Sequence, residues 1–337
     1  MKKRNIALIA SFFLLILIVL ALTGVIPVFK TPAPAFTPSS NELLVHFLNV
    51  GQADSIFIQL PDGKTMLIDT GESDSANTII SYLENSGCTK IDYLVITHPH
   101  ADHIGGLPAV IDKMEIGSVY MPRIYHTTNL FDKLLTAIEN KGLRINEAKA
   151  GAVILYVPGL RADIVAPVRE YNNLNNYSTV VKISYGSTAF LFMGDAESQS
   201  ERDITADVSA DVLKVGHHGA NTSTCPSFLK RVSPTYAVIS VGANNTYKHP
   251  SDKILSRLAA LMVNVYRTDI HGTIVFTSDG NAIKIKTFKP DTVMVWITTT
   301  STRYHSRNDC GNMNPEKARQ VTLEYAVTRY KPCSKCN

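Results

Sequence analysis

The sequence has little excess of charge of either sign. Its 33 lysines and arginines stand against 29 aspartates and glutamates, which leaves a formal net charge of +4 over 337 residues. Both ends are basic: residues 2–4 are three cations, and the stretch from Pro290 onward has seven basic and four acidic residues, so residues 5–289 carry about −2. A strongly basic surface on the central part of the chain is therefore not supported, and any contact with nucleic acid there must be local.

Long apolar runs are also scarce, since residues 6–28 form the only one. This run is long enough to span a bilayer as a helix, and the three cations before it predict that the rest of the chain faces outward. It is either a signal peptide cleaved near Ala21–Gly24 or an uncleaved anchor, and its length and the lack of a convincing A-x-A site favour the anchor. A single span excludes a transmembrane channel, so the chain cannot move DNA across a membrane by itself.

Cysteine is scarce as well, with five in the whole chain. Cys88 and Cys225 stand alone in the sequence and are expected to be buried small hydrophobes. The other three lie in residues 290–337, a tail whose composition differs from that of the preceding part.

The tail predicts a second, structural metal site. Cys333 and Cys336 have the C-x-x-C spacing of half a zinc site, and His305 and Cys310 are expected to supply the other half. Four such ligands make a closed structural zinc site, whereas a disulfide plus a spare thiol is the alternative in an outward-facing chain. The YHxxxC…PCxxC layout resembles the short Cys/His module appended to some bacterial hydrolases, and it is similar to the zinc module of the Ada repair protein.

Composition divides the rest of the chain into a linker and one large domain. Prolines and serines in residues 29–41 predict an extended linker, and residues 42–289 alternate short strand and helix patterns without a short-period repeat. The chain is 45% hydrophobic, which is enough for a sizeable core. Expected strands are 43–49, 55–60, 65–69, 91–97, 117–121, 152–157, 161–166, 179–185, 189–193, 211–215, 235–241, 263–267, 272–277 and 282–288, and expected helices are 76–86, 104–113, 130–141, 198–204 and 253–260. Strands followed by a helix–strand alternation, twice over, predict two mixed sheets packed face to face with helices outside.

The stretch IDYLVITHPHADHIGG, residues 91–106, carries the strongest chemical signal. Its first half becomes fully apolar, which predicts a buried strand. Four metal-binding side chains follow that strand within six positions: His98, His100, Asp102 and His103. Imidazole favours zinc, iron or manganese, and a carboxylate can hold or bridge a second ion, so the stretch predicts a hydrolytic metal centre.

Other candidate residues stand at the ends of expected strands, where loops direct side chains toward a site. Asp69 is expected to orient a metal-binding histidine by accepting a hydrogen bond from its ring, and Asp195 to bridge two metals. His217 is expected to bind the second ion, while the neighbouring His218 either supports a ligand or touches substrate. His249 is expected to donate to a substrate oxyanion. The alternatives are an ordinary turn for Asp69, a helix N-cap for Asp195 and a surface loop for His249.

These motifs resemble the metallo-β-lactamase fold superfamily, and most of all the β-lactamase-like domain of the competence protein ComEC and its stand-alone relatives. The resemblance covers residues 42–289 and is carried by HFLNVGQADSIFIQL, LIDTG, THPHADHIGG, FLFMGDAE, LKVGHHGANTS and YKHPS. It implies an α/β fold, a four-layer αββα sandwich. It also implies two divalent ions, the first held by His98 and His100, the second by Asp102, His103 and His217, with Asp195 bridging them and Asp102, His218 and His249 taking part in the reaction.

The sequence departs from many superfamily hydrolases in one place. Those enzymes put a third histidine on the first ion, between the HxHxDH motif and the bridging aspartate. Here the equivalent region, Asn172–Thr179, has no histidine, although Ser178 is a polar group nearby. ComEC-like members share this gap. An oxygen-rich site suits harder ions, so manganese is open beside zinc.

The sequence therefore predicts an outward-facing, membrane-anchored or secreted metal-dependent hydrolase. The leading interpretation is a phosphodiesterase or nuclease, with extracellular or incoming single-stranded DNA as a substrate and the cytoplasmic membrane as a partner of the N-terminal helix. A hydrolase for a β-lactam, a lactone or a thioester is the second interpretation. A non-catalytic surface binding module is the third, and the nearly complete ligand set argues against it.

Overall fold

The computed structural model describes the central domain and parts of the tail. The described residues are 41–289, 294–298, 302–305, 310, 315, 317–322, 326, 329–333 and 336. The expected signal peptide or anchor at 1–28, and all of the linker except Asn41, lie outside the described residues. Among the described helices, none is both long and apolar enough to cross a bilayer.

The first sheet joins an antiparallel half to a parallel half. Its eight strands run in the order β15-β14-β1-β2-β3-β4-β5-β6, antiparallel from β15 to β3 and parallel from β3 to β6. The bounds are β1 Leu43–Phe47, β2 Ile56–Gln59, β3 Thr65–Ile68, β4 Lys90–Val95, β5 Glu115–Met121, β6 Ile145–Glu147, β14 Thr273–Ser278 and β15 Ile283–Phe288.

The second sheet has the same two-part construction. Its seven strands run in the order β13-β12-β11-β10-β9-β8-β7, antiparallel from β7 to β10 and parallel from β10 to β13. The bounds are β7 Val153–Val157, β8 Leu160–Ala166, β9 Val180–Tyr185, β10 Thr188–Phe192, β11 Val212–Lys214, β12 Tyr236–Ile239 and β13 Asn264–Arg267.

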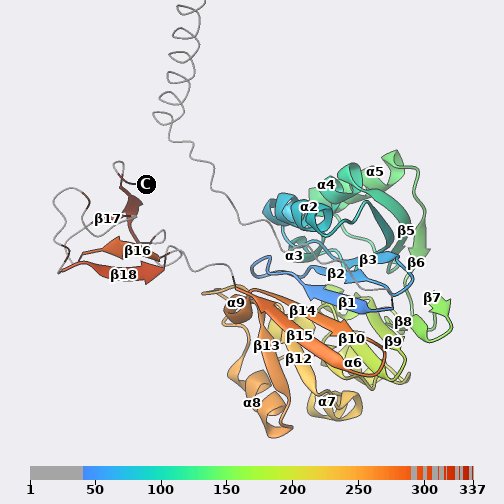
Figure 1. The fold of residues 1–337 in the computed structure, drawn as a ribbon. Helices are drawn as coiled ribbons and strands as arrows, with labels where there is room; N and C mark the ends of the chain where they lie inside the picture. Colours follow the sequence, from blue (N-terminus) through green and yellow to red (C-terminus); the bar gives the residue numbers. More distant parts are fainter. Residues whose placement is uncertain are drawn as a thin grey trace, which may run out of the picture.

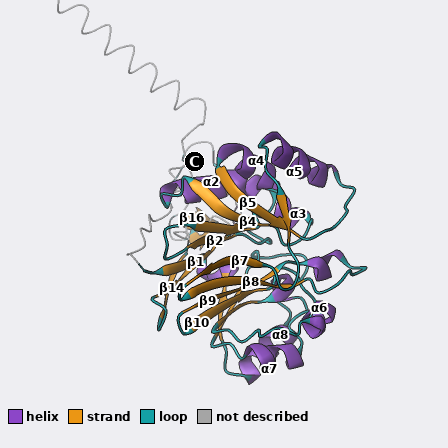
Figure 2. Cartoon of the chain, turned by 90° about the vertical axis from the view of Figure 1, so that its right-hand side faces the viewer, coloured by secondary structure: helices purple, strands orange, loops and turns teal. Residues whose placement is uncertain are grey.

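Helices cover the outer faces of both sheets. The bounds are α2 Ala76–Asn85, α3 Ala101–Ile104, α4 Leu107–Lys113, α5 Asn129–Asn140, α6 Ser198–Asp203, α7 Pro226–Val232, α8 Asp252–Ala260 and α9 Thr268–His271, with short 3₁₀ turns at Ser73–Ser75, Leu174–Tyr177 and Gly216–Gly219. In Figure 2 the sheets are stacked, with α2, α4 and α5 outside one of them and α6, α7 and α8 outside the other. Figure 1 traces the same elements along the sequence. The predicted four-layer αββα sandwich is confirmed.

Aromatic rings from both sheets fill the space between them. Phe47 and Phe276 of the first sheet contact each other edge-on at 5.7 Å between ring centroids, and Phe47 lies 6.0 Å from Phe192 of the second sheet. All three rings are buried. Separate apolar clusters join each sheet to its own helices. This packing holds the ends of the two sheets in a fixed relation, which matters because the candidate site lies between those ends.

The segment after β4 differs from the sequence expectation. One helix was expected over 104–113, but the chain forms α3 and α4 around Gly105 and Gly106, so Asp102 and His103 lie on the first helical turn. A Cβ atom added to Gly105 would lie 2.4 Å from the backbone nitrogen of Ser73, so only glycine fits there. This close approach holds the short helix α3 against the loop that follows β3.

Strand β6 and helix α7 are among the other elements that were not expected from the sequence. The edge strand β6 is exposed along its whole length, so it lacks the apolar alternation by which strands are recognised. Helix α7 begins at Pro226, and proline is well tolerated in the first turn of a helix, where its missing N–H is not needed.

The described part of the tail contains four short strands. They are β16 Met294–Ile297, β17 Arg303–Tyr304, β18 Arg319–Thr322 and β19 Lys331–Pro332. Strand β16 pairs with β18, and β17 pairs in parallel with β19. The second pairing brings the segment after Tyr304 beside the segment after Pro332.

Candidate metal centre

The chemistry-bearing residues follow the carboxyl ends of strands in both sheets. Asp69 follows β3 and His98 follows β4, while Asp195 follows β10 and His218 follows β11. In open α/β sheets these strand ends are the usual place for a ligand. Here the two sheets bring their strand ends together, so that residues more than a hundred positions apart share one site.

Four buried or half-buried side chains make one ligand group. Asp102, His103, Asp195 and His218 each offer one atom, and these atoms all lie within 4.8 Å of one another. Nε2 of His103 is 3.3 Å from Oδ2 of Asp195, and Nε2 of His218 is 3.2 Å from Oδ2 of Asp102 and 3.5 Å from Oδ1 of Asp195. Two carboxylates and two imidazoles at this spacing are a suitable donor set for one divalent cation.

Two of these atoms are buried and lack a hydrogen-bond partner among the described residues: Nε2 of His103 and Oδ1 of Asp195. A buried polar atom without a partner is costly, and a bound ion can satisfy it in place of a hydrogen bond. Burial opposes the charged forms of both groups. Asp195 and Asp69 nevertheless raise the pKa of His103 well above its usual value, so a cation bound there would displace the ring proton. His218 and His103 in turn hold the pKa of Asp195 well below its usual range. The carboxylate is therefore ionised, as a metal ligand must be.

Histidines 98 and 100 lie beside this group. Nε2 of His98 is 3.9 Å from Oδ2 of Asp195 and 2.9 Å from Nδ1 of His100, and the His98 and His103 ring centroids are 4.2 Å apart. Burial lowers the pKa of His98 well below its usual value and also lowers the pKa of His100. Neutral imidazoles are the form that binds a cation, and these two rings lie next to the group of Asp102, His103, Asp195 and His218 without belonging to it.

Asp69 lies behind the ligands and contacts His103. Its Oδ2 is 2.7 Å from Nδ1 of His103, and because an ionised carboxylate only accepts, Nδ1 donates there while Nε2 faces Asp195. Thr97 holds the carboxylate in place, with its backbone N–H donating to Oδ1 at 2.9 Å and its hydroxyl to Oδ2 at 2.5 Å. This is the position in which a carboxylate orients a ligating histidine.

The two adjacent histidines after β11 are arranged differently from the expectation. His218, not His217, joins Asp102 and His103. Nδ1 of His218 donates to the carbonyl of Ser240 at 2.9 Å, and Nε2 faces the carboxylates of Asp102 and Asp195. Nδ1 of His217 lies 3.2 Å from Oε1 of Glu197, and its Nε2 lies 3.7 Å from Oδ2 of Asp195, the oxygen that His98 also faces.

The backbone causes this arrangement. His217 and His218 have φ values of 50° and 52°, in the left-handed region that few residues other than glycine adopt. Two consecutive left-handed residues tighten the turn and send the adjacent rings to different sides of Asp195. The GHHG pattern predicts two nearby imidazoles, but it does not indicate which of them reaches which ion.

The region that lacks a third histidine supports the ligands with polar side chains. The hydroxyl of Ser178 accepts from the backbone N–H of Asp195 at 3.0 Å and lies 3.4 Å from Nδ1 of His98. The side-chain amide of Asn175 lies 3.4 Å from Nδ1 of His217. These groups position the ring of His98 and the backbone of Asp195.

Asp54 and Lys214 were not singled out from the sequence. Lys214 is fully buried, forms an ion pair with Oδ2 of Asp54 and donates to the carbonyl of Gly194 at 2.9 Å. Oδ1 of Asp54 lies 3.5 Å from Nδ1 of His218. A lysine inside the apolar run Val212–Val215 is the sequence signal for such a pair, because a buried charge needs a partner.

His249 lies at the edge of the centre. Its ring centroid is 5.7 Å from that of His217, it is half-buried, and burial lowers its pKa. Its backbone is held by Asn245, whose Oδ1 accepts from the His249 N–H at 3.0 Å. His249 therefore borders the site without joining the ligand group of Asp102, His103, Asp195 and His218.

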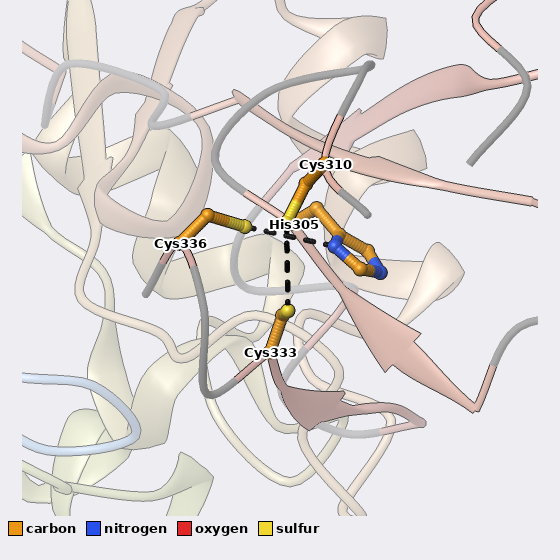
Figure 3. A group of neighbouring side chains, drawn as sticks. All are labelled: His305, Cys310, Cys333 and Cys336. Atoms are coloured by element: carbon orange, nitrogen blue, oxygen red, sulfur yellow. Dashed lines mark hydrogen bonds between the residues drawn. The ribbon is translucent and has the colours of Figure 1, made fainter. Parts of the chain in front are cut away.

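A second group of metal-binding side chains lies in the tail. Figure 3 shows His305, Cys310, Cys333 and Cys336 pointing toward one another, and their ligand atoms all lie within 4.8 Å of one another. The sulfurs of Cys310 and Cys333 are 3.7 Å apart, and the sulfur of Cys336 is 3.6 Å from Nδ1 of His305. The β17–β19 pairing brings the two halves together, with the N–H of Cys333 donating to the carbonyl of Tyr304 at 3.0 Å.

Two face-to-face mixed sheets with a histidine–aspartate cluster at their strand ends define a metal-dependent hydrolase. The family model of the metallo-beta-lactamase superfamily matches residues 48–243. The chain belongs to this superfamily, and the superfamily implies divalent metal ions, which the residues described above are suited to hold.

Curated relatives extend the similarity beyond the family model. ComE operon protein 3 of Bacillus subtilis is 31% identical over 258 residues, which cover 70% of this chain and 33% of that protein. Competence protein ComA of Neisseria gonorrhoeae is 30% identical over 252 residues, which cover 72% of this chain and 33% of that protein. The chain thus matches about a third of the length of these relatives. Among solved structures, the metallo-beta-lactamase fold protein YhfI of Bacillus subtilis aligns with a TM-score of 0.48 at 12% identity, over 71% of this chain and 100% of that one.

Proposed function

We propose that the chain is a metal-dependent phosphodiesterase that cleaves nucleic acid, as expected for a ComEC-like domain. The observation that carries the proposal is the Asp195 carboxylate, which lies 3.3–3.9 Å from ring nitrogens of four histidines. A carboxylate so placed is suited to link two cations, and paired cations are a common solution for in-line displacement at phosphorus. The names of the competence-protein relatives support the same substrate class.

The residues divide naturally between two ions. Asp102, His103 and His218 would hold one ion, His98 and His100 would hold the other with His217 at its side, and Asp195 would serve both. When bound, such ions supply an activated water and neutralise charge on the attacked group. The carboxylates of Asp102 and Asp195 admit manganese as well as zinc. Asp69 keeps His103 in the ligating tautomer, and His249 is placed at the edge of the site to donate to an oxygen of the substrate.

A substrate panel tests the proposal. The purified full-length chain, loaded with Mn²⁺ or with Zn²⁺, is offered single-stranded DNA, bis-p-nitrophenyl phosphate, nitrocefin and a lactone. We expect hydrolysis of both phosphodiesters and of neither other compound, because the site lacks the third histidine that many other superfamily hydrolases use. Hydrolysis of nitrocefin with neither phosphodiester cleaved would overturn the proposal, and bound metal without any turnover would favour a binding module.

The same assay examines His249. The His249→Ala variant is expected to bind metal normally and to slow both phosphodiester reactions, because it removes a donor beside the centre and no ligand. Full turnover by this variant would remove His249 from the mechanism.

We also propose that the catalytic domain acts outside the membrane. The three cations and the apolar run of residues 6–28 support either an anchor or a signal peptide, with the domain on the far side. Protease added to intact cells that produce the full chain is expected to degrade residues 42–289. Protection of this domain until the cells are lysed would contradict the proposal.

We further propose that the tail group holds a structural zinc ion. Four ligands of types Cys and His match a closed zinc site, and the sulfur separation of 3.7 Å between Cys310 and Cys333 is well beyond the roughly 2.05 Å of a disulfide. Cys333→Ser is expected to lower the zinc content by one ion per chain, because a closed tetrahedral site loses a thiolate.

The matched control for the tail is Cys88→Ala, which removes a cysteine outside the tail and is expected to leave the zinc content unchanged. Unaltered zinc in Cys333→Ser would contradict the structural site. So would an intact mass for the native chain that is lower by two hydrogens, since that mass indicates a disulfide.

A further inference from the structure

A row of rings leads from the metal centre to the surface. The His217 ring lies beside Asp195, the His249 ring lies edge-on to it at 5.7 Å and 72°, and the Tyr247 ring stacks on His249 at 5.7 Å and 25°. Tyr247 is 70% exposed. A single exposed tyrosine is uninformative by itself, but this one continues a series of ring contacts that begins at the residues proposed to hold the ions.

The loop that carries Tyr247 is held by its neighbours. The amide of Asn245 donates to the carbonyls of Gly242 at 3.0 Å and of His249 at 2.6 Å, and the N–H of Gly242 donates to Oε1 of Gln52 at 3.1 Å. At the far end, the N–H of Ser251 donates to the carbonyl of Gly219 at 2.9 Å. These bonds hold the backbone on both sides of Tyr247 and tie its far end to the turn that carries His217 and His218, while the Tyr247 ring itself contacts His249.

We propose that Tyr247 is a stacking platform for one nucleobase of a single-stranded substrate whose phosphodiester lies at the metal centre. The inference rests on the proposed phosphodiesterase function and adds the residue that selects nucleic acid over other phosphodiesters. A flat ring accepts any base, so the platform gives affinity without sequence preference.

The charge near Tyr247 and the stacking chemistry of its ring both fit a single-stranded nucleic acid. Lys248 is exposed beside the platform and offers a local cation to a neighbouring phosphate, although the central part of the chain is slightly acidic overall. In a duplex each base is already stacked on its neighbours, whereas a single strand leaves base faces available to an aromatic side chain. The platform therefore favours single strands over duplexes.

The test compares an intact oligonucleotide with one of the same length that carries abasic residues around the cleaved bond. Stacking one base is expected to change affinity by roughly tenfold. Tyr247→Ala in the full-length, metal-loaded chain is therefore expected to raise KM for the intact strand about tenfold, with kcat changed less than twofold. Tyr247→Phe is expected to behave as the native chain, because stacking does not need the hydroxyl.

Combining the abasic strand with Tyr247→Ala gives a double-mutant cycle for the contact between the base and Tyr247. The native chain is expected to bind it about as weakly as Tyr247→Ala binds the intact strand, and combining the two changes is expected to add little. Fluorescence anisotropy in the presence of a chelator is expected to show the same pattern in Kd, which separates strand binding from turnover.

The control is Tyr156→Ala. Tyr156 is 71% exposed but lies on β7, next to the turn at Gly159 whose carbonyl accepts from Gly186. Gly186 precedes β10 and Asp195 follows it, so Tyr156 lies toward the end of the sheet away from the centre. Its loss is expected to leave KM and Kd unchanged.

The outcomes separate the two proposals. If the native chain cleaves the intact and the abasic strand with equal KM, and Tyr247→Ala changes neither, the platform is overturned while the phosphodiesterase function stands. If the native chain cleaves no strand of either kind, the proposed function fails and the platform with it.

Discussion

Replacement of Asp195 by asparagine is expected to abolish phosphodiester hydrolysis by the full-length chain. Asparagine keeps the shape of the side chain but removes the negative charge that His98, His103, His217 and His218 surround. Loss of several kcal/mol of transition-state stabilisation corresponds to a fall of roughly 10³-fold or more in kcat/KM. The metal content of the centre is expected to fall from two ions to one or none, measured by elemental analysis after dialysis.

Asp203→Asn is the matched control for this experiment. Asp203 ends helix α6, close in sequence to Asp195, and pairs with Arg169 at the surface at 2.8 Å. Exposed ion pairs contribute about 0–1 kcal/mol, so this variant is expected to keep both its metals and its activity. An Asp195→Asn protein that retains two ions and most of its turnover would show that this carboxylate does not link them.

The second large effect is expected at Lys214. Lys214→Met leaves the Asp54 carboxylate buried without its ion-pair partner and removes a hydrogen bond to Gly194, which precedes Asp195. Breaking a buried pair from one side typically costs about 3–5 kcal/mol. For a domain of this size that corresponds to a Tm lower by roughly 10 °C, measured by calorimetry or circular dichroism.

The Lys214 variant is also expected to lose affinity for metal. Asp54 lies 3.5 Å from Nδ1 of His218, so an unpaired Asp54 no longer keeps that ring in place. Disturbing a residue behind a metal ligand typically costs about 10- to 100-fold in metal affinity. Titration with Mn²⁺ or Zn²⁺ in the absence of substrate measures this loss.

Lys182→Met controls for the loss of a lysine from the same sheet. Lys182 pairs with Asp207 at 2.7 Å, but the Asp207 side chain is 74% exposed. Water can therefore solvate the remaining charge, and the loss of stability is expected to stay below about 1 kcal/mol.

The double variant Asp54→Asn, Lys214→Met removes both buried charges and is expected to regain part of the stability that Lys214→Met loses. A Lys214→Met protein with native Tm and native metal affinity would contradict a supporting role for this pair.

Local sequence was sufficient where the chemistry is local. His98, His100, Asp102 and His103 lie within six positions after a buried strand, so a metal-binding cluster at that strand end followed from the sequence directly. The αββα architecture also followed, because the order of short strands and helices is preserved in the periodicity of apolar residues. The C-x-x-C spacing of Cys333 and Cys336 likewise predicted a convergence that the described tail residues show.

Local sequence was insufficient where the contacts of a side chain depend on backbone geometry or on a partner far away in the chain. Which of His217 and His218 joins Asp102 depends on two consecutive left-handed residues, a conformation that the GHHG pattern does not predict. Asp54 and Lys214 lie 160 positions apart, and neither shows its partner in its own surroundings. Helix α3 starts earlier than expected because Gly105 packs against the backbone near Ser73, a contact made by a distant loop.

By itself, the sequence determined the kinds of ligand atoms, their order along the chain and the layers of the fold, because residue type and apolar periodicity are local properties. Only the tertiary structure decided which ligand atoms lie close together, which histidine faces which carboxylate and which buried lysine lies beside them. Those relations depend on how the carboxyl ends of the strands in the two sheets are placed next to each other. Packing between residues far apart in the chain determines that placement.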